Sequence, residues 1–318
     1  MEYTSLNTYL KERFGCKVYR IAINGGFTCP NRDGRIDTRG CIFCSGYGSG
    51  DFALDASFSV TEQIERGKEK VAGKMHGKGK YIAYFQAFTN TYAPVKRLRS
   101  LFTEAIDHPD IAVLSVATRP DCLPEEVLDL LSELNERKPV WVELGLQTIH
   151  EKSAEYIRRG YPLQVYDEAV RKLRERDIEV ITHVILGLPG ETREDMLETV
   201  RYVCKEQKGV IEHDNSDNIS QQEIETDKKD GYRIQGIKLS LLHVIEGTDL
   251  AKDYKMGKFQ CMSMEEYVDL IRDCIAIIPK DVVIHRMTGD GAKKTLVAPL
   301  WSADKKRVLN AINRALQE

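Results

Sequence analysis

The sequence VYRIAINGGFTCPNRDGRIDTRGCIFC, residues 18–44, joins a short apolar run to three closely spaced cysteines. The run Val18–Ile23 is rich in β-branched residues and predicts a strand. Cys29, Cys41 and Cys44 follow in the loop at the C-terminal end of this strand. In β/α barrels that end of the strands carries the chemistry. The three cysteines are therefore the first candidates for a functional site.

Three thiolates are one fewer than most iron–sulfur clusters take from a protein. A cluster held by these three cysteines would keep one iron open to bind and activate a small molecule. Two other interpretations of the spacing stay open. Cys41 and Cys44 could be half of a structural zinc site that Cys29 and Cys16 complete, although zinc sites usually have two paired spacings. The same pair could also form a redox dithiol.

Beyond this loop, β-branched runs alternate with longer amphipathic stretches, which is the pattern of βα units around a parallel sheet. The apolar runs are nearly continuous, as expected for strands covered on both faces. The strands expected are Val18–Ile23, Tyr81–Phe85, Ile111–Val116, Val140–Leu146, Val180–Leu186 and Ile237–Val244. The fold class expected is α/β, a partial (β/α)6 barrel with a C-terminal α/β extension.

The chain divides into an N-terminal segment (1–17), a barrel core (18–250) and an extension or lid (251–318). In the extension, Ser263 caps a helix that runs to about Ile278, and Val282–Ile284 predicts a strand. The residues after that strand, from 285 to 290, are expected to form a loop. Residues 209–235 are polar and acidic with few apolar side chains, which predicts a mobile surface insertion.

Composition places the protein among globular chains, since 42% of residues are hydrophobic and 30% are charged. The sequence contains neither an apolar run of about 20 residues nor a signal segment, so we expect a cytoplasmic protein without a membrane partner. Cytosolic cysteines stay reduced, which favours metal ligation over disulfides. The net charge of -3 does not indicate nucleic acid, although local basic clusters could contact phosphates. These clusters are Arg66–Lys80, Lys96–Arg99, Arg171–Arg176 and Lys293–Arg307.

Ordered motifs along the chain resemble the radical S-adenosylmethionine (SAM) superfamily. The eleven-residue and two-residue gaps between the cysteines, with Phe43 before the last of them, resemble one branch in particular. That branch includes the catalytic subunit of Elongator and small bacterial relatives of the YhcC and MnmL (YtqA) type. Further matches occur in order at residues 85–94, 118–121, 143–148, 158–161, 183–191, 285–286 and 299–301. The resemblance therefore covers nearly the whole chain.

The resemblance implies that Cys29, Cys41 and Cys44 ligate a [4Fe–4S] cluster, with the amino and carboxylate groups of SAM on the fourth iron. It assigns cofactor binding to Gln86, Asn90, Arg119, Glu143, Gln147, Gly187, Leu188 and Pro189. Residues 86–90 stand where the superfamily usually has a glycine-rich segment, so that contact would come from backbone carbonyls. His285 and Arg286 are the candidates for substrate contact. Two structural alternatives stay open: a buried Glu143 paired with an arginine, and an ordinary strand-to-helix turn at 187–190.

The chemistry that the resemblance implies is reductive cleavage of SAM to methionine and a 5′-deoxyadenosyl radical, which abstracts hydrogen from the substrate. An electron donor such as flavodoxin or ferredoxin is then a partner. The Elongator-like branch acts on the wobble uridine of transfer RNA (tRNA). Its MnmL-type members are linked to remodelling of the 5-position side chain from carboxymethylaminomethyl to aminomethyl. We therefore expect tRNA as the substrate.

Two further hypotheses compete with this one. Radical chemistry on a small metabolite or a protein side chain would use the same cysteines. A zinc-stabilised nucleic-acid binding module would use them for structure alone. The sequence does not specify the oligomeric state.

Overall fold

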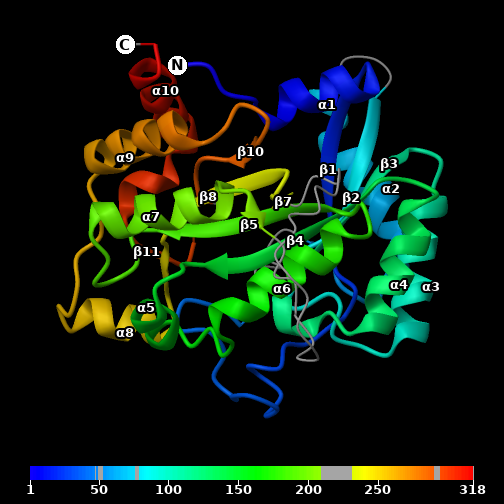
Figure 1. Ribbon diagram of the computed structural model, residues 1–318, viewed down its shortest axis with the longest axis horizontal. Helices are drawn as coiled ribbons and strands as arrows, with labels where there is room; N and C mark the ends of the chain where they lie inside the picture. Colours follow the sequence, from blue (N-terminus) through cyan, green and yellow to red (C-terminus); the bar gives the residue numbers. More distant parts are fainter. Residues whose placement is uncertain (47, 49–52, 76–78, 209–230, 290–293, 318) are drawn as a thin grey trace, which may run out of the picture.

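Helices and strands alternate along the chain in the computed structural model (Figure 1). The structure describes residues 1–318 except 47, 49–52, 76–78, 209–230, 290–293 and 318. The strands are β1 (Lys17–Ile23), β2 (Gly79–Phe85), β3 (Ile111–Thr118), β4 (Val140–Gln147), β5 (Glu179–Leu186), β6 (Gln207–Lys208), β7 (Gly231–Tyr232), β8 (Gly236–Leu241), β9 (Val244–Ile245), β10 (Val283–Arg286) and β11 (Leu296–Ala298). The helices are α1 (Leu6–Phe14), α2 (Val60–Val71), α3 (Val95–Asp107), α4 (Glu125–Asn135), α5 (Glu151–Tyr156), α6 (Leu163–Arg174), α7 (Arg193–Cys204), α8 (Asp249–Lys255), α9 (Met264–Ile277) and α10 (Lys305–Ala315).

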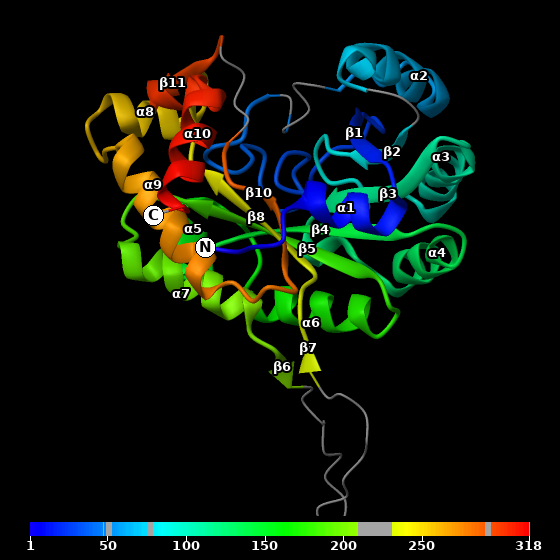
Figure 2. The same cartoon turned by 90° about the horizontal axis from the view of Figure 1, so that it is seen from above.

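A seven-stranded parallel sheet forms the centre of the molecule, in the order β1-β2-β3-β4-β5-β8-β10. Helices cover its outer side, and Figure 2 shows them as an incomplete ring around the strands. The main apolar core lies between the sheet and these helices, as continuous apolar strands predict. The expected partial α/β barrel is thus confirmed.

The last strand of the sheet comes from the C-terminal extension. The sequence predicts a strand at Val282–Ile284 followed by a loop, but β10 runs to Arg286 and pairs in parallel with β8. The prediction that His285 and Arg286 lie in a loop is therefore wrong, and the sheet has one strand more than the six expected. The sixth strand is also shorter than Ile237–Val244, since Val244 belongs to β9, which pairs with β11 instead. The domain boundaries at residues 17 and 250 stay a prediction.

Helix α1 closes the N-terminal end of the barrel. Leu10 packs with Ile82, Trp141 and Ile181, whose side chains point to the inside of the curled sheet. A backbone hydrogen bond from Ile284 to Thr4 O, 2.8 Å long, ties the start of the chain to β10. Helix α1 therefore covers the N-terminal end of the barrel, opposite the C-terminal ends of the strands.

The capping predictions are confirmed at α2 and α9, which Ser59 and Ser263 begin with complete capping boxes. Of the predicted insertion at 209–235, residues 209–230 lie outside the described residues. Residues 231–235 are packed: β7 pairs with β6, and Ile234 is buried. Within the described residues, the helices are all too short or too polar to span a lipid bilayer.

Candidate active site

A cavity of about 280 Å³ lies at the C-terminal ends of the strands. From the sequence candidates it gathers Cys29, Cys41, Cys44, Gln86, Arg119, Glu143, Gln147 and Arg286. These residues come from the loop after β1, from the segments after β2 and β3, and from β4 and β10, which the parallel sheet brings to one edge. A larger cavity of about 630 Å³ lies beside α4 and α6 but is not lined by any of the three cysteines.

The cysteine loop is held by its own hydrogen bonds. The backbone amide of Arg32 donates to Cys29 O at 2.8 Å, and that of Cys44 donates to Cys41 O at 3.0 Å. Asn31, which is only 1% exposed, donates from Nδ2 to Cys41 Sγ at 3.4 Å. Gly40 has a φ of +76°, a left-handed conformation that favours glycine directly before the second cysteine. The loop therefore presents its thiols in a defined arrangement.

The donor set fits an iron–sulfur cluster with one open iron. Burial, together with the neighbouring Cys44, raises the pKa of Cys41 to about 12, whereas reactive redox thiols typically have a lowered pKa. Cys16 precedes β1 whereas Cys29 follows it, and a seven-residue strand is about 20 Å long. Cys16 cannot join the other three in one metal site, and the zinc site built on it is wrong.

Below the cysteines, Glu143 is a fully buried carboxylate with four partners. Ser115 Oγ donates to its Oε1 at 2.7 Å, His183 Nε2 lies 2.7 Å from its Oε2, and Lys238 Nζ bonds to the same oxygen. Arg20 Nη2 lies 3.4 Å from Oε1. Burial alone would raise the pKa of Glu143, but Lys238 and Arg20 hold it well below its usual range. The structural alternative of a buried Glu143 paired with an arginine agrees with this arrangement, which also includes a lysine, and the binding of SAM by Glu143 stays a prediction.

Lys238 is the functional candidate that sequence reasoning missed. Its side chain is 1% exposed, and Nζ also lies 3.2 Å from Tyr84 Oη. The sequence did contain a signal for this residue, since Lys238 stands within the apolar strand β8. A lysine that is buried in such a strand is almost always paired with an opposite charge. Burial and Lys238 together lower the pKa of His183 to about 4, so this histidine is neutral at neutral pH.

Five predicted site residues do not line this cavity: Asn90, Gly187, Leu188, Pro189 and His285. Asn90 is buried and donates to Ala117 O at 2.8 Å. Gly187 has a φ of +92°, and its amide donates to Met196 Sδ at 3.0 Å. The His285 ring packs edge-on against Trp141, with centroids 5.2 Å apart, deeper inside the barrel. Their roles toward cofactor or substrate stay predictions.

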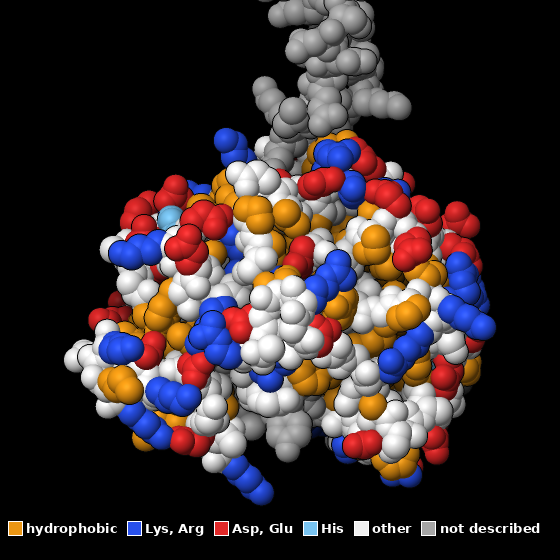
Figure 3. Space-filling model, turned by 90° about the horizontal axis from the view of Figure 1, so that it is seen from below, with side chains coloured by type: hydrophobic (Ala, Val, Ile, Leu, Met, Phe, Trp, Pro, Cys, Tyr) orange, Lys and Arg blue, Asp and Glu red, His pale blue; other side chains and the backbone are white. Residues whose placement is uncertain are grey.

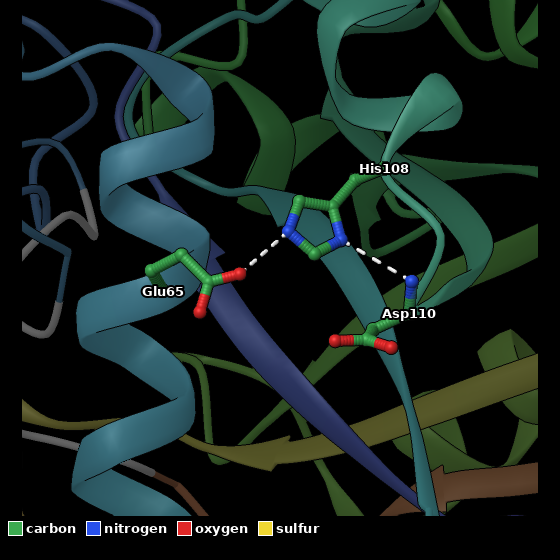
Figure 4. Close-up of side chains that lie close together, drawn as sticks. All are labelled: Glu65, His108 and Asp110. Atoms are coloured by element: carbon green, nitrogen blue, oxygen red, sulfur yellow. Dashed lines mark hydrogen bonds and ion pairs between the residues drawn. The ribbon is translucent and has the colours of Figure 1, made fainter.

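A second cluster of metal-ligand side chains joins Glu65, His108 and Asp110 (Figure 4). His108 Nε2 lies 2.8 Å from Glu65, and its Nδ1 accepts the backbone amide of Asp110 at 3.2 Å. Lys68 Nζ bonds to both carboxylates, at 2.9 and 2.6 Å. The Lys68 ammonium therefore compensates the charge of both carboxylates, Glu65 and Asp110. The role of this cluster that the contacts support is structural, since it links α2 to the start of β3.

In two of the predicted basic clusters, Lys96–Arg99 and Arg171–Arg176, several cations pair with acidic side chains. Arg99 pairs with Glu133 at 2.6 Å, and Lys172 and Arg176 both pair with Glu125, at 2.9 and 2.7 Å. Figure 3 shows the same mixture of signs over one face of the molecule. These residues have the character of solvated helix faces more than of a phosphate-binding stripe.

Comparison with known proteins agrees with this site. Residues 29–203 match the model of the Radical SAM superfamily, and residues 234–318 match that of the Radical SAM C-terminal domain. YtqA of Bacillus subtilis (strain 168) is 45% identical over 318 residues, 99% of this chain and 89% of YtqA. A tRNA uridine(34) acetyltransferase of Methanocaldococcus jannaschii is 27% identical over 59% of this chain and 30% of its own length.

Among solved structures, the archaeal Elp3 of Methanocaldococcus infernus has the same fold, with a TM-score of 0.64. The match covers 93% of this chain and 63% of Elp3 at 18% identity, and therefore bears on the fold alone. Enzymes of the matched superfamily use a [4Fe–4S] cluster and SAM, which agrees with the three cysteines in one cavity. The chain therefore belongs to the radical SAM superfamily.

Proposed function

We propose that this radical SAM enzyme modifies the wobble uridine of tRNA, converting a carboxymethylaminomethyl side chain at the 5-position to aminomethyl. In the overall reaction SAM would take up the hydrogen atom and the electron that the carboxymethyl carbon next to nitrogen loses, and water would then cleave the carbon–nitrogen bond and release the two-carbon unit as an oxo acid. The observation that carries the proposal is a cavity whose lining joins the three cysteines to a buried layer of charged groups, suited to a polar substrate side chain. The similarity to a tRNA uridine(34) acetyltransferase supports the substrate class, since position 34 is the wobble position.

The proposed roles follow from the positions of the residues. Cys29, Cys41 and Cys44 hold the cluster, which together with SAM supplies one-electron reductive chemistry when both are bound. Gln86, Arg119 and Gln147, around the same cavity, bind SAM.

Glu143 keeps the polar layer charged and ordered, and Arg286 contacts the substrate. A flavodoxin or ferredoxin in the cytoplasm supplies the electron.

Mass spectrometry of tRNA nucleosides tests the proposal directly. Cells that lack the gene are expected to accumulate the carboxymethylaminomethyl form and lose the aminomethyl form, and a plasmid copy is expected to restore it. A plasmid copy with Cys41→Ala is the matched control and is expected not to restore it. An unaltered nucleoside profile in the deletion strain would refute the tRNA substrate and favour a small metabolite or a protein side chain.

A further inference from the structure

His183, on β5, lies in the wall of the cavity that the three cysteines also line. Ile185, two residues further along the same strand, lines this cavity too, so both side chains point to the inside of the barrel. Because β5 runs parallel to β1 toward the cysteine loop, His183 is the deeper of the two. Its side chain is 23% exposed, whereas that of Glu143 is fully buried. A molecule in the cavity can therefore contact the His183 ring directly.

The hydrogen bond between His183 and Glu143 determines which ring nitrogen carries the proton. Nε2 lies 2.7 Å from Oε2 of Glu143. Although burial acts to raise the pKa of Glu143, Lys238 and Arg20 hold it well below its usual range, so the carboxylate is ionised. An ionised carboxylate accepts hydrogen bonds and cannot donate them, so Nε2 is the donor. The neutral imidazole then has its lone pair on Nδ1.

This lone pair is available to accept a proton. Among the residues that the structure describes, the hydrogen bond to Glu143 is the single polar contact of the His183 ring. Burial and the nearby Lys238 lower the pKa of His183 to about 4, so Nδ1 is unprotonated at neutral pH. Hydrolytic enzymes use the same arrangement for a general base, with one imidazole nitrogen donating to a buried carboxylate and the other facing the reactants.

Other polar groups in the described cavity wall are poorly suited to accept a proton. Glu143 is fully buried and has four partners already. Burial raises the pKa of Tyr84 and of Tyr161, so both phenols stay protonated. Arginine keeps its proton inside proteins, and the three cysteines are the proposed cluster ligands. The neutral base of the described wall is therefore His183.

The proposed reaction requires a base in its second half. Loss of a hydrogen atom and an electron from the carboxymethyl carbon leaves a double bond between this carbon and nitrogen, which water then cleaves. Water has to lose a proton as its oxygen bonds to the carbon. The nitrogen has to gain a proton before the carbon–nitrogen bond breaks. One side chain that accepts a proton and then returns it serves both steps.

We propose that His183 is the general base and general acid of this hydrolysis, an inference that rests on the proposed function. Nδ1 takes a proton from water as the water oxygen bonds to the carbon of the double bond, and the imidazolium then gives this proton to the nitrogen. The carbon–nitrogen bond breaks with its electron pair going to nitrogen, while Nδ1 takes the hydroxyl proton of the two-carbon fragment. Transfer of that proton to the released amine gives the aminomethyl group as its ammonium ion, an oxo acid and a neutral His183. Glu143 stabilises the imidazolium in each step.

A single turnover on an anticodon stem-loop RNA tests this role, with the anaerobically reconstituted enzyme, SAM and a reductant. The carboxymethyl carbon of the wobble uridine carries two deuterium atoms. Deuterium in 5′-deoxyadenosine then measures hydrogen abstraction, and the aminomethyl nucleoside measures hydrolysis. A quench with borohydride reduces the double bond of any intermediate that remains. The intermediate is thereby detected as carboxymethylaminomethyl nucleoside with one deuterium in place of two.

The variant His183→Gln retains a side-chain amide that can donate to Glu143, but it has no nitrogen that takes up a proton. It is expected to transfer deuterium and to form the aminomethyl nucleoside about 100-fold more slowly than the wild type. The nucleoside with one deuterium is expected to accumulate. The matched control is His150→Gln, since His150 is 25% exposed and lies outside the lining of the cavity. This control is expected to form the aminomethyl nucleoside at the wild-type rate.

The outcomes separate the inference from the proposed function. Formation of the aminomethyl nucleoside by His183→Gln at the wild-type rate would overturn the inference alone. Loss of cluster binding, SAM binding or deuterium transfer in this variant would also overturn it, because His183 would then act before hydrolysis. A wild-type reaction without deuterium transfer to 5′-deoxyadenosine would overturn the proposed function and the inference together.

Nitrogen NMR of the wild-type enzyme with isotope-labelled histidine gives a second test, which does not depend on catalysis. The signals of His183 are those missing from the spectrum of His183→Gln. At neutral pH the ring is expected to be neutral, with the proton on Nε2 and none on Nδ1. A proton on Nδ1 would overturn the inference, since that nitrogen could not then accept one from water.

Discussion

Asn31 Nδ2 lies 3.4 Å from Sγ of Cys41 and 2.7 Å from the carbonyl oxygen of Arg158. The amide thus joins the cysteine loop to the segment after α5 and points an N–H group at one of the three sulfurs. Hydrogen bonds to cluster sulfurs are among the factors that set the reduction potential of an iron–sulfur cluster, because they stabilise the more negative reduced state.

Replacement of Asn31 by alanine is therefore expected to shift the cluster potential to a more negative value. The measurement is a redox titration of the reconstituted protein followed by electron paramagnetic resonance. Asn310→Ala, on the exposed side of α10, is the control and is expected to keep the wild-type potential. An unchanged potential in Asn31→Ala, with full iron content, would refute a tuning role.

The assignment of Cys41 as a cluster ligand predicts that alanine substitutions of Cys41, after β1, and of Cys16, before β1, have opposite effects on cluster binding. Cys41→Ala is expected to abolish cluster binding and 5′-deoxyadenosine formation, because the loop loses one of its three ligands. Cys16→Ala, before β1, is expected to keep both. Iron and sulfide content, with chromatography of SAM cleavage products, check this. SAM cleavage by Cys41→Ala would contradict the ligand assignment.

The buried pair of Glu143 and Lys238 predicts strong coupling in stability. Glu143→Gln leaves Lys238 and Arg20 without their buried counter-charge and is expected to lower the free energy of unfolding by roughly 3–5 kcal/mol. The double variant with Lys238→Met is expected to recover part of this loss, because it also removes a buried charge. Urea denaturation of the two single variants and the double variant gives the coupling energy. Strictly additive effects would show that the pair does not interact.

Stability is expected to depend on pH through His183. Its pKa is lowered from 6.5 to about 4 in the folded state by burial and by Lys238. Between these values the unfolded chain binds a proton that the folded chain does not, so the free energy of unfolding falls as the pH drops from about 6.5 toward 4. The loss from this residue reaches roughly 3 kcal/mol at most.

His285, whose pKa is also lowered, contributes in the same direction. The variant His183→Gln is therefore expected to have a shallower slope of unfolding free energy against pH, and not a flat one. Denaturant titrations from pH 7.5 to 5 measure both slopes. Identical slopes in the variant and the wild type would place the pH dependence elsewhere.

From the pairing of β6 with β7 we expect that residues 209–230, which connect these strands, are dispensable for SAM cleavage. Lys208 and Gly231 are paired across this short antiparallel ladder, so an Asn-Gly turn can join β6 to β7 in place of residues 209–230. The ladder follows α7 and precedes β8, which places it at the end of the barrel opposite the cysteine loop. The shortened protein is expected to keep wild-type SAM cleavage. Loss of cleavage in a folded, iron-loaded protein would assign this segment a role in the site.

Much of the fold could be predicted from local sequence patterns, because the signals for its strands and helix starts each involve only a few neighbouring residues. The strands that lead into the cysteine loop and to Glu143 are nearly continuous apolar runs, and helices α2 and α9 begin at capping boxes. Both signals depend on neighbours a few residues apart, so they survive in the isolated sequence. The predicted end of β10 was wrong because the last two residues of this strand, His285 and Arg286, are polar and resemble the start of a loop.

The charged layer inside the barrel could not be predicted in this way. Lys238 is about 95 residues from Glu143 along the chain, and Arg20 comes from the opposite edge of the sheet. Whether a lysine in a strand is buried and paired depends on which strand the curled sheet places opposite it. That placement depends on contacts between residues far apart in the sequence, which the periodicity of a single strand does not predict.

The α/β architecture, the capped helices and the three-cysteine loop can all be predicted from the order of residues, because periodicity, capping and ligand spacing act over short distances. Tertiary structure alone decided that Cys16 lies away from the other cysteines and that β10 completes the sheet. It alone also decided that Arg20, Lys238 and Arg286 converge beneath the cysteines. The physical reason is that a parallel sheet carries every strand's C-terminal end to one edge, so distant residues meet only after the sheet has formed.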